Sequence, residues 1–296
     1  MPRPLRLAAL ALDPRAGAVD RNLAAALAGL AAAADAGARL VALPEMWPTS
    51  FTADVDPGLV RAGEAAVEAL GHAAAARGVV AVGSAYASRP GGGAPTNRAH
   101  VVGARAGAGP RPAGPPTLGG YDKVHLFSPT AEHLVFQAGA EAPPVLDVGD
   151  VRLAPLVCYD LRFPDLVRAP VRRGAELLVV VAQWPDTRAA AWRALVAGRA
   201  AEGQCFVLAA NRSGTDEVGR RRLTLSFSGH TLVAAPDGAL RAEGRLVTDP
   251  DAAEPALLLA DIDLDEVRAM RRAVPVLRDE RPDVYARLPR AAEPLE

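Results

Sequence analysis

Apolar segments of strand length alternate with Ala-rich segments of helix length along most of this 296-residue chain. Strands are predicted at residues 5–12, 39–43, 79–86, 98–104, 151–157, 176–182, 205–210, 230–235, 239–241 and 256–262. Helices are predicted at residues 20–36, 60–77, 186–202 and 265–272, with one more after Pro164. Strand–helix–strand units build parallel pairs, whereas consecutive strands build antiparallel pairs. The order therefore predicts an α/β fold in which helices cover mixed sheets, rather than a plain doubly wound sheet.

A single domain accounts for nearly all of the chain. Hydrophobic residues make up 50% of the sequence, which is ample for one large core. The Pro/Gly-rich stretches at residues 88–97 and 107–120 are predicted loops inside that domain, because dense sequence motifs follow them. We expect one domain over residues 1–273, followed by a Pro- and Arg-rich tail over residues 274–296 that has little periodicity of its own.

The composition argues against several classes of partner. The formal net charge is −1, whereas nucleic acids and anionic membranes select basic surfaces. No apolar run approaches the roughly 18 residues of a membrane span, and the first one is too short for a signal peptide. Two cysteines do not make a disulfide framework, so we expect a cytoplasmic protein with reduced thiols. No His, Cys or Asp cluster has metal-ligand spacing and no glycine-rich phosphate loop follows an early strand, so no metal or cofactor is expected.

The chain contains a single lysine, Lys123, among its 33 basic residues. Arginine is a planar fork that stays protonated, whereas lysine is a compact ammonium that can sit as a point charge beside a developing anion. A position that keeps lysine in such a chain therefore indicates a need for that point charge. Chance survival of one lysine is the alternative, and the neighbouring residues decide between the two.

Two reactive side chains follow directly after predicted strands. Cys158 ends the apolar run 151–157 and precedes a turn into a helix, a geometry that exposes a nucleophile beside backbone N–H groups. Glu45 ends the apolar run 40–44, at the strand edge where α/β folds usually place their sites. The ordinary alternatives are a buried core cysteine, which is our expectation for Cys205, and a solvated glutamate.

Glu45 and Cys158 combine with Lys123 and with Glu132, nine residues further on, and all four lie in longer motifs. The motifs are Leu43-Pro44-Glu45, Tyr121 to Phe127, Glu132-His133 with Phe136 and Gly139, Val157 to Pro164, Asn211 to Gly214, Gly229 to Thr231, Pro236 to Gly238, and Arg281 to Tyr285. Together they resemble the nitrilase superfamily of carbon–nitrogen hydrolases. The resemblance covers essentially the whole chain, and the lysine and cysteine motifs are long and specific.

The resemblance implies a four-layer αββα sandwich, with two mixed β-sheets inside and helices outside. It implies that Cys158 is the nucleophile and Glu45 the general base. It implies that Lys123 and the backbone N–H of Tyr159 stabilise the oxyanion, while Glu132 positions Lys123 and Glu45. It also implies a homodimer or a higher homo-oligomer, with the C-terminal tail reaching across the dimer interface.

Charge counting adds a prediction that does not depend on the resemblance. Two carboxylates and one ammonium around a thiol leave an excess of negative charge. That excess keeps Cys158 protonated at rest and raises the pKa of one glutamate.

The residues after the cysteine narrow the substrate class. Nitrile-hydrolysing members of the superfamily usually have Trp-Glu there, whereas Tyr159 to Pro164 looks like the omega-amidase and deaminated-glutathione-amidase branches. The Glu132-His133 segment most resembles bacterial omega-amidases, which act on 2-oxoglutaramate and 2-oxosuccinamate. The expected partners are thus water and a small amide that carries a carboxylate. The candidate substrate-binding residues are Arg162 or Arg212, either of which can bind a carboxylate bidentately, and Trp184.

Other functions stay open at this point. A deaminated glutathione amidase, another aliphatic amidase or an N-carbamoyl hydrolase of the same superfamily would use the same four residues. A glutamine-fed amidotransferase subunit is less expected, because no ATP-binding segment accompanies the motifs. A non-catalytic α/β binding protein would explain the core and the loops, but it would not need the four residues together.

Two departures from the omega-amidase pattern bear on substrate choice. A stretch from Thr215 to Ser228 follows the Asn-Arg motif, and Thr231 replaces the usual serine. We expect this stretch to line the mouth of the pocket. Trp47-Pro48 replaces more familiar neighbours after the first glutamate, and we expect it to reshape the pocket as well.

Overall fold

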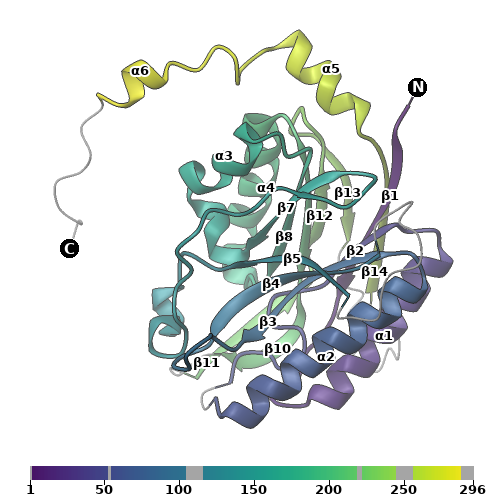
Figure 1. Ribbon diagram of the computed structural model, residues 1–296, viewed down its shortest axis with the longest axis vertical. Coiled ribbons are helices and arrows are strands. Elements are labelled where there is room, and N and C mark those ends of the chain that lie inside the picture. Colours follow the sequence, from purple (N-terminus) through teal and green to yellow (C-terminus); the bar gives the residue numbers. More distant parts are fainter. Residues whose placement is uncertain (1, 53–54, 105–115, 219–221, 245–255, 288–296) are drawn as a thin grey trace.

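The computed structural model describes residues 2–52, 55–104, 116–218, 222–244 and 256–287. Four layers stack in the order helices, sheet, sheet, helices, and the two sheets pack against each other in the middle (Figure 1). The αββα sandwich with mixed sheets inside, expected from the sequence, is confirmed by this arrangement.

The first sheet has six strands in the order β14-β1-β2-β3-β4-β5. These are β1 (Pro4–Ala11), β2 (Leu40–Ala42), β3 (Val80–Ala87), β4 (Thr96–Gly103), β5 (Thr117–Asp122) and β14 (Ala256–Asp263). The strands β1, β2 and β3 are parallel, and the other neighbours are antiparallel. Helices α1 (Val19–Asp35) and α2 (Pro57–Ala76) join the parallel strands and cover the outer face of this sheet.

The second sheet repeats this plan in the order β13-β12-β9-β8-β7-β6. These are β6 (Leu146–Asp147), β7 (Arg152–Val157), β8 (Leu177–Ala182), β9 (Phe206–Asn211), β12 (Thr231–Ala234) and β13 (Leu240–Gly244). The strands β7, β8 and β9 are parallel, with antiparallel strands on both sides. Helices α3 (Pro164–Arg172) and α4 (Ala189–Gly203) cover its outer face.

Alternation along the strands determines which residues fill each layer. In β1, Leu5 and Leu7 pack between the two sheets, whereas Ala8 and Leu10 pack against the helices. Because both faces of these strands are covered, they read as continuous apolar runs, as buried parallel strands do. Trp47 joins the helix–sheet layer rather than the pocket described below, so the expectation that it reshapes the pocket is not met.

Two predictions were wrong in detail. The predicted loop 107–120 contains the start of β5 at Thr117. A Cβ atom at Gly119 would meet Leu146 and one at Gly120 would meet Arg98, so both glycines permit close packing of β5; residues 105–115 lie outside the described part. The stretch after Asn211 forms a separate hairpin of β10 (Ser213–Val218) and β11 (Leu223–Ser228). β10 is almost entirely polar, β11 alternates apolar and polar residues, and only Ser213, Val218 and Phe227 of the two strands are buried, so neither strand forms an apolar run.

The C-terminal segment leaves the sandwich after α5 (Asp265–Ala273) and passes over α3 towards α6 (Pro282–Tyr285) (Figure 1). Glu280 fixes this segment to α3, because its carboxylate accepts from Arg168 Nε at 2.5 Å and Arg172 Nε at 2.8 Å. The amide Nε2 of Gln204 donates to the carbonyl of Val274 at 2.6 Å.

Candidate active site

The four predicted catalytic residues meet where the parallel strands of both sheets end. Glu45 follows β2 and Cys158 follows β7, while Lys123 follows β5 directly. Glu132 begins the short 3₁₀ turn η2 (Glu132–Leu134). Glu45, Glu132 and Cys158 line one narrow cavity of about 30 Å³, the catalytic pocket, and Lys123 lies fully buried among them.

Lys123 bridges the two carboxylates. Its Nζ donates to Glu45 Oε1 at 2.8 Å and to both oxygens of Glu132, at 3.0 and 2.8 Å. Burial lowers the pKa of Lys123, but the charges of Glu132 and Glu45 outweigh burial, so its pKa lies above its ordinary value. Lys123 is therefore held as an ammonium, and its side chain is fully buried.

Glu45 is held on every side by polar groups. Besides Lys123, Asn97 Nδ2 donates to Glu45 Oε1 at 2.8 Å, and the backbone N–H of Gln183 donates to Oε2 at 3.0 Å. The side chain of Gln183 donates in turn to the Glu45 carbonyl at 2.9 Å. This network fixes the carboxylate in the orientation that a general base needs.

Glu132 accepts from the backbone N–H of Phe127 at 3.0 Å as well as from Lys123. Burial raises the pKa of Glu132 to about 7, and the nearby Glu45 charge adds to the rise, while Lys123 opposes it. The pKa of one glutamate is thus raised, in the direction that charge counting predicts.

Cys158 occupies a strained turn between β7 and the 3₁₀ helix η3 (Cys158–Arg162). Its φ is +44°, a left-handed conformation that non-glycine residues seldom adopt and that is often found at functional sites. Burial, and next the Glu45 carboxylate, raise the pKa of the Cys158 thiol well above its ordinary value. The thiol is therefore protonated at rest, and any reaction as a thiolate requires a base to take its proton.

Buried polar contacts brace the turn at Cys158. Asp160 accepts from the Tyr121 hydroxyl at 2.8 Å and from the backbone N–H of His125 at 2.9 Å. Asp160 thereby ties the lysine motif to the cysteine motif. Arg199 donates from Nε to the carbonyl of Leu161 at 3.0 Å. Arg199 was not among the predicted site residues, because nothing in the linear sequence marks an arginine of α4 as buried.

Two arginines stand in the wall of the catalytic pocket. Arg162, a predicted substrate-binding residue, lies over the ring of Trp184 with its Cζ 4.7 Å from the ring centroid. Arg188, in the 3₁₀ turn η4 (Asp186–Arg188), lies 5.4 Å from the Phe127 centroid. Arg188 was not anticipated, because the sequence placed it inside the predicted helix 186–202, whereas it lies in the 3₁₀ turn before α4.

Arg212 does not line the pocket. Its fully buried guanidinium donates to Asp13, Ser50 and Asp216 at 3.0–3.2 Å, and also to Gln183 Oε1 at 3.1 Å. These protein partners leave the group no freedom to meet a substrate carboxylate. Arg212 acts instead through Gln183, whose backbone and side chain both hold Glu45.

The hairpin β10–β11 closes one side of the pocket with apolar side chains. Val218 and Leu225 line the cavity together with Phe51 and Phe127. Asp186 anchors the hairpin, since its carboxylate accepts from the Ser228 backbone at 2.8 Å and hydroxyl at 2.7 Å. The expectation that this stretch lines the pocket mouth is therefore met.

Within the described residues, no group of three or more His, Cys, Asp or Glu side chains is placed to hold a metal ion. None of the helices in the described part is long and apolar enough to cross a membrane.

An αββα sandwich with a thiol, two carboxylates and a lone ammonium at its strand ends defines a narrow class of protein. The chain belongs to the carbon-nitrogen hydrolase family, whose sequence profile matches residues 6–272. The predicted resemblance is thereby confirmed.

Two curated relatives and one solved structure are similar to the chain. It is 37% identical over 165 residues to 2-oxoglutaramate amidase from Bacillus subtilis, covering 56% of this chain and 58% of that relative. It is 31% identical over 240 residues to the omega-amidase YafV from Yersinia enterocolitica, covering 81% of this chain and 83% of that relative. It superposes with a TM-score of 0.76 and 26% identity on an amidase variant from Nesterenkonia sp. AN1, over 95% of each chain. That structure shows covalent addition of the acetamide moiety of fluoroacetamide at the active site cysteine.

Proposed function

We propose that this protein hydrolyses the amide bond of a small, carboxylate-bearing amide, as an omega-amidase does, through a thioester on Cys158. The carrying observation is the buried ammonium of Lys123, which hydrogen-bonds both Glu45 and Glu132 next to the thiol. A merely structural ion pair would not need a strained cysteine in the same cavity. The similarity to 2-oxoglutaramate amidase and to an omega-amidase supports the substrate class.

Acylation begins with a proton transfer. Glu45 accepts the proton of the Cys158 thiol while the sulfur forms a bond to the amide carbon. The carbonyl oxygen becomes an oxyanion, which the Lys123 ammonium and the backbone N–H of Tyr159 stabilise. Tyr159 lies in the first turn of η3, where backbone N–H groups have no partner inside the helix.

Collapse of this intermediate breaks the carbon–nitrogen bond. Glu45 donates its proton to the leaving nitrogen, ammonia departs, and the acyl group stays on Cys158 as a thioester. Glu45 then takes a proton from a water molecule that attacks the thioester carbon. The carbon–sulfur bond breaks, the carboxylic acid leaves, and the thiol regains its proton.

The two pocket arginines suit a substrate with a carboxylate at its far end. Arg162 and Arg188 line the same cavity as Cys158, and each presents a planar fork that can bind a carboxylate bidentately. This feature favours 2-oxoglutaramate and 2-oxosuccinamate, which yield a 2-oxo acid and ammonia.

The apolar wall favours a second candidate, an aliphatic amidase. Val218, Leu225 and Phe51 offer no hydrogen-bonding group to a polar substrate. An aliphatic amide would fill this wall without using the arginines. Deaminated glutathione is a third substrate of the same chemistry.

An ammonia-release assay discriminates these candidates. We expect turnover of 2-oxoglutaramate and 2-oxosuccinamate to exceed that of deaminated glutathione, simple aliphatic amides and nitriles. Turnover of nitriles without acid amides would contradict the omega-amidase proposal, and preference for aliphatic amides would favour the second candidate. If no compound is turned over and a thiol probe labels Cys158 equally well after Lys123→Ala, the protein is a binding protein rather than an enzyme.

We propose further that the C-terminal segment after residue 273 contacts a second copy of the chain. Val274, Val276, Val284 and Tyr285 expose apolar side chains on a segment that has few contacts of its own, which supports a homodimer. Removal of residues 274–296 should lower the mass measured by light scattering to that of one chain. We place the protein in the cytoplasm, since its two cysteines are both free and make no disulfide framework; cell fractionation tests this.

A further inference from the structure

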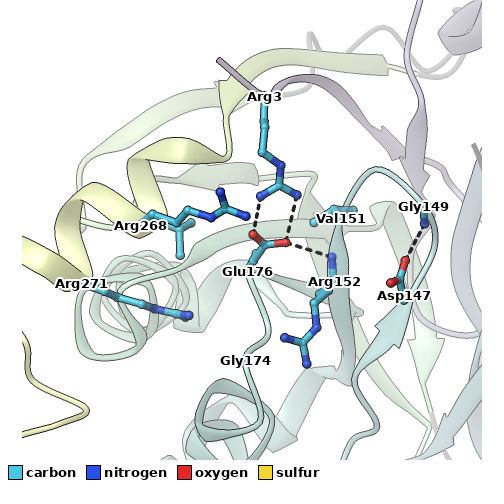
Figure 2. A pocket seen from close by; sticks show the side chains of 10 residues that line it. Arg3, Asp147, Gly149, Val151, Arg152, Gly174, Glu176, Arg268 and Arg271 are labelled. Carbon is cyan, nitrogen blue, oxygen red and sulfur yellow. Dashed lines mark hydrogen bonds and ion pairs between the residues drawn. The ribbon is translucent and has the colours of Figure 1, made fainter. Parts of the chain in front are cut away.

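A second cavity lies at the opposite end of the parallel strands from the catalytic pocket. It has a volume of about 350 Å³, within the range of small-molecule sites. Arg152 begins β7 and Glu176 precedes β8 at this end, whereas Cys158 and Gln183 follow the same two strands at the other. We call it the arginine cavity; it is lined by Arg3, Asp147, Gly149, Val151, Arg152, Gly174, Glu176, Val267, Arg268 and Arg271 (Figure 2).

Cations outnumber carboxylates in the arginine cavity. Four arginines face two acidic side chains, Glu176 and Asp147. Glu176 is already occupied by Arg3, whose Nη1 and Nη2 donate to it at 2.6 and 3.3 Å (Figure 2). Burial raises the pKa of Glu176, but hydrogen bonds from Arg3 and from the Arg152 backbone outweigh it, so its pKa lies below its ordinary value. This carboxylate is therefore ionised and already forms an ion pair with Arg3.

The other three arginines keep unused donors. Arg268 makes no hydrogen bond to any residue in the described ranges, and Asp265 lies 3.7 Å from its Nη1. Arg152 donates only through Nη2, to the carbonyl of Arg173 at 2.6 Å. Arg271 donates through Nη2 to backbone carbonyls, while its Nε is buried without a partner among the described residues. A buried guanidinium N–H without an acceptor is costly, and a bound anion would supply the acceptor.

The backbone at Gly174 makes room for one of these side chains. A Cβ atom at this position would lie 2.5 Å from Nη1 of Arg152, and the φ of +89° is one that favours glycine. Figure 2 shows Arg152 and Arg268 entering the cavity from different elements, β7 and α5. Residues far apart in the sequence thus bring their positive charges to one hollow.

We propose that the arginine cavity binds a small molecule that carries a phosphate monoester. Asp265 pairs with Arg268, so three carboxylates leave one of the four arginines in excess; this excess and the unused guanidinium donors favour a phosphate monoester, whose charge is about −1.5 to −2 at neutral pH. Guanidinium forks bind phosphate oxygens bidentately. The volume of about 350 Å³ exceeds the needs of a free phosphate ion and admits the organic part of an ester.

Titration calorimetry with a hexose 6-phosphate tests the site on the full chain. We expect one molecule bound per chain, with affinity that falls as salt rises. Arg268→Gln and Arg271→Gln should each weaken binding roughly tenfold or more, since a hydrogen bond to a charged group is lost. Arg272→Gln is the matched control: it removes the same charge from the same helix but does not line the cavity, and it should bind like the wild type.

Comparison ligands and one distant variant complete the experiment. Inorganic phosphate should bind more weakly than the ester, and the unphosphorylated hexose and 2-oxoglutarate should not compete. The double variant Arg162→Gln, Arg188→Gln should keep full ester binding. The proposal is overturned by absence of binding at millimolar ester, by equal binding of inorganic phosphate or 2-oxoglutarate, or by loss of binding in that double variant.

Because Arg268 is exposed, its variant decides the matter even if Arg271→Gln fails to fold; wild-type affinity in folded Arg268→Gln also overturns the proposal.

Discussion

The catalytic pocket and the arginine cavity occupy opposite ends of the same strands, and they treat charge in opposite ways. In the catalytic pocket one ammonium, Lys123, lies between two carboxylates, and all three are buried. In the arginine cavity the cations are partly exposed and outnumber the carboxylates. A buried set of charges must be compensated within the protein, because desolvation of an unpaired charge is prohibitive. An accessible excess of positive charge, in contrast, can be compensated by a bound anion.

The choice of cation follows the geometry of its partners. Arginine serves at the arginine cavity, on the surface and, as Arg199 and Arg212, in buried networks, where a planar fork can donate to several oxygens at once. The single lysine serves in the closed pocket, where a compact ammonium fits among Glu45, Glu132 and the substrate carbonyl. The lone lysine is therefore explained by its site, and substitutions at the two ends should have very different consequences.

The largest expected effect is at the nucleophile. Cys158→Ala should reduce ammonia release by roughly 10⁴-fold or more, because no thioester can form. Cys205→Ala is the matched control: Cys205 is fully buried in the helix–sheet core, so its loss should lower the melting temperature and leave kcat nearly unchanged. Retained turnover in Cys158→Ala would contradict the mechanism.

Lys123→Arg should lower kcat by roughly 10²–10³-fold, as loss of an oxyanion donor does, although the charge is kept. Lys123 is fully buried, so the wider guanidinium also has to displace Glu45 or Glu132. Steady-state kinetics on a variant with a cooperative melting transition is the measurement. A kcat near that of the wild type would show that charge alone suffices and that the single lysine is an accident of composition.

The fold and the meeting of Glu45 with Cys158 in one cavity could be predicted from the sequence for a physical reason. Glu45 and Cys158 end continuous apolar strands, and parallel strands bring their carboxyl ends to one edge. The pocket wall could not be predicted in the same way. Arg212 is indistinguishable in sequence from a substrate-binding arginine, because its partner Asp13 lies 199 residues away and is brought close only by the fold.

The arginine cavity was equally invisible in the sequence. Its arginines come from the residue before β1, from β7 and from α5, in segments that look like ordinary solvated surface. The hairpin β10–β11 was hidden by its polar composition, although the unusual length of the stretch after Asn211 marked the place. Features set by a local sequence pattern were predicted, whereas features set by charged residues that the fold brings together from distant segments were missed.

The activity should fall on the acid side of neutrality. With the pKa of Glu132 at about 7, protonation below that pH leaves Glu45 as the sole counterion of Lys123 and weakens it as a base. We expect kcat/KM to rise about tenfold per pH unit up to about pH 7 and then level. Glu132→Gln should be slow at every pH and lack this limb; a limb that persists in the variant would assign the titration to another group.

Folding stability should change with pH in the opposite direction to activity, falling as the pH rises. Because the pKa of Glu132 is raised from its ordinary 4.5 to about 7, the folded state binds this proton more readily than the unfolded state. The stabilisation is therefore fully present below pH 4.5 and is lost as the pH rises through 7. Denaturant unfolding of the wild type and Glu132→Gln at several pH values measures it, and equal pH dependence of the two would refute it.

Arg162→Gln should affect substrate binding more than chemistry. We expect KM for 2-oxoglutaramate to rise roughly 10- to 100-fold, as loss of a charge-assisted hydrogen bond predicts, with kcat changed far less. The KM of an uncharged aliphatic amide should stay the same, since it makes no use of the guanidinium. Equal losses for both substrates would mean that Arg162 braces the turn at Cys158 rather than binding a carboxylate.

The smallest expected effect is a difference between the two regions in their dependence on salt concentration. Raising the ionic strength from about 0.05 to 0.5 M shortens the range of interactions between exposed charges and barely touches buried pairs. Ester binding at the arginine cavity should weaken roughly tenfold, whereas kcat for an uncharged amide should change by less than about twofold. Calorimetry and ammonia release on one preparation give both values. A kcat that follows the salt dependence of ester binding would show that the ammonium of Lys123 is open to solvent, and the contrast between the two ends would fail.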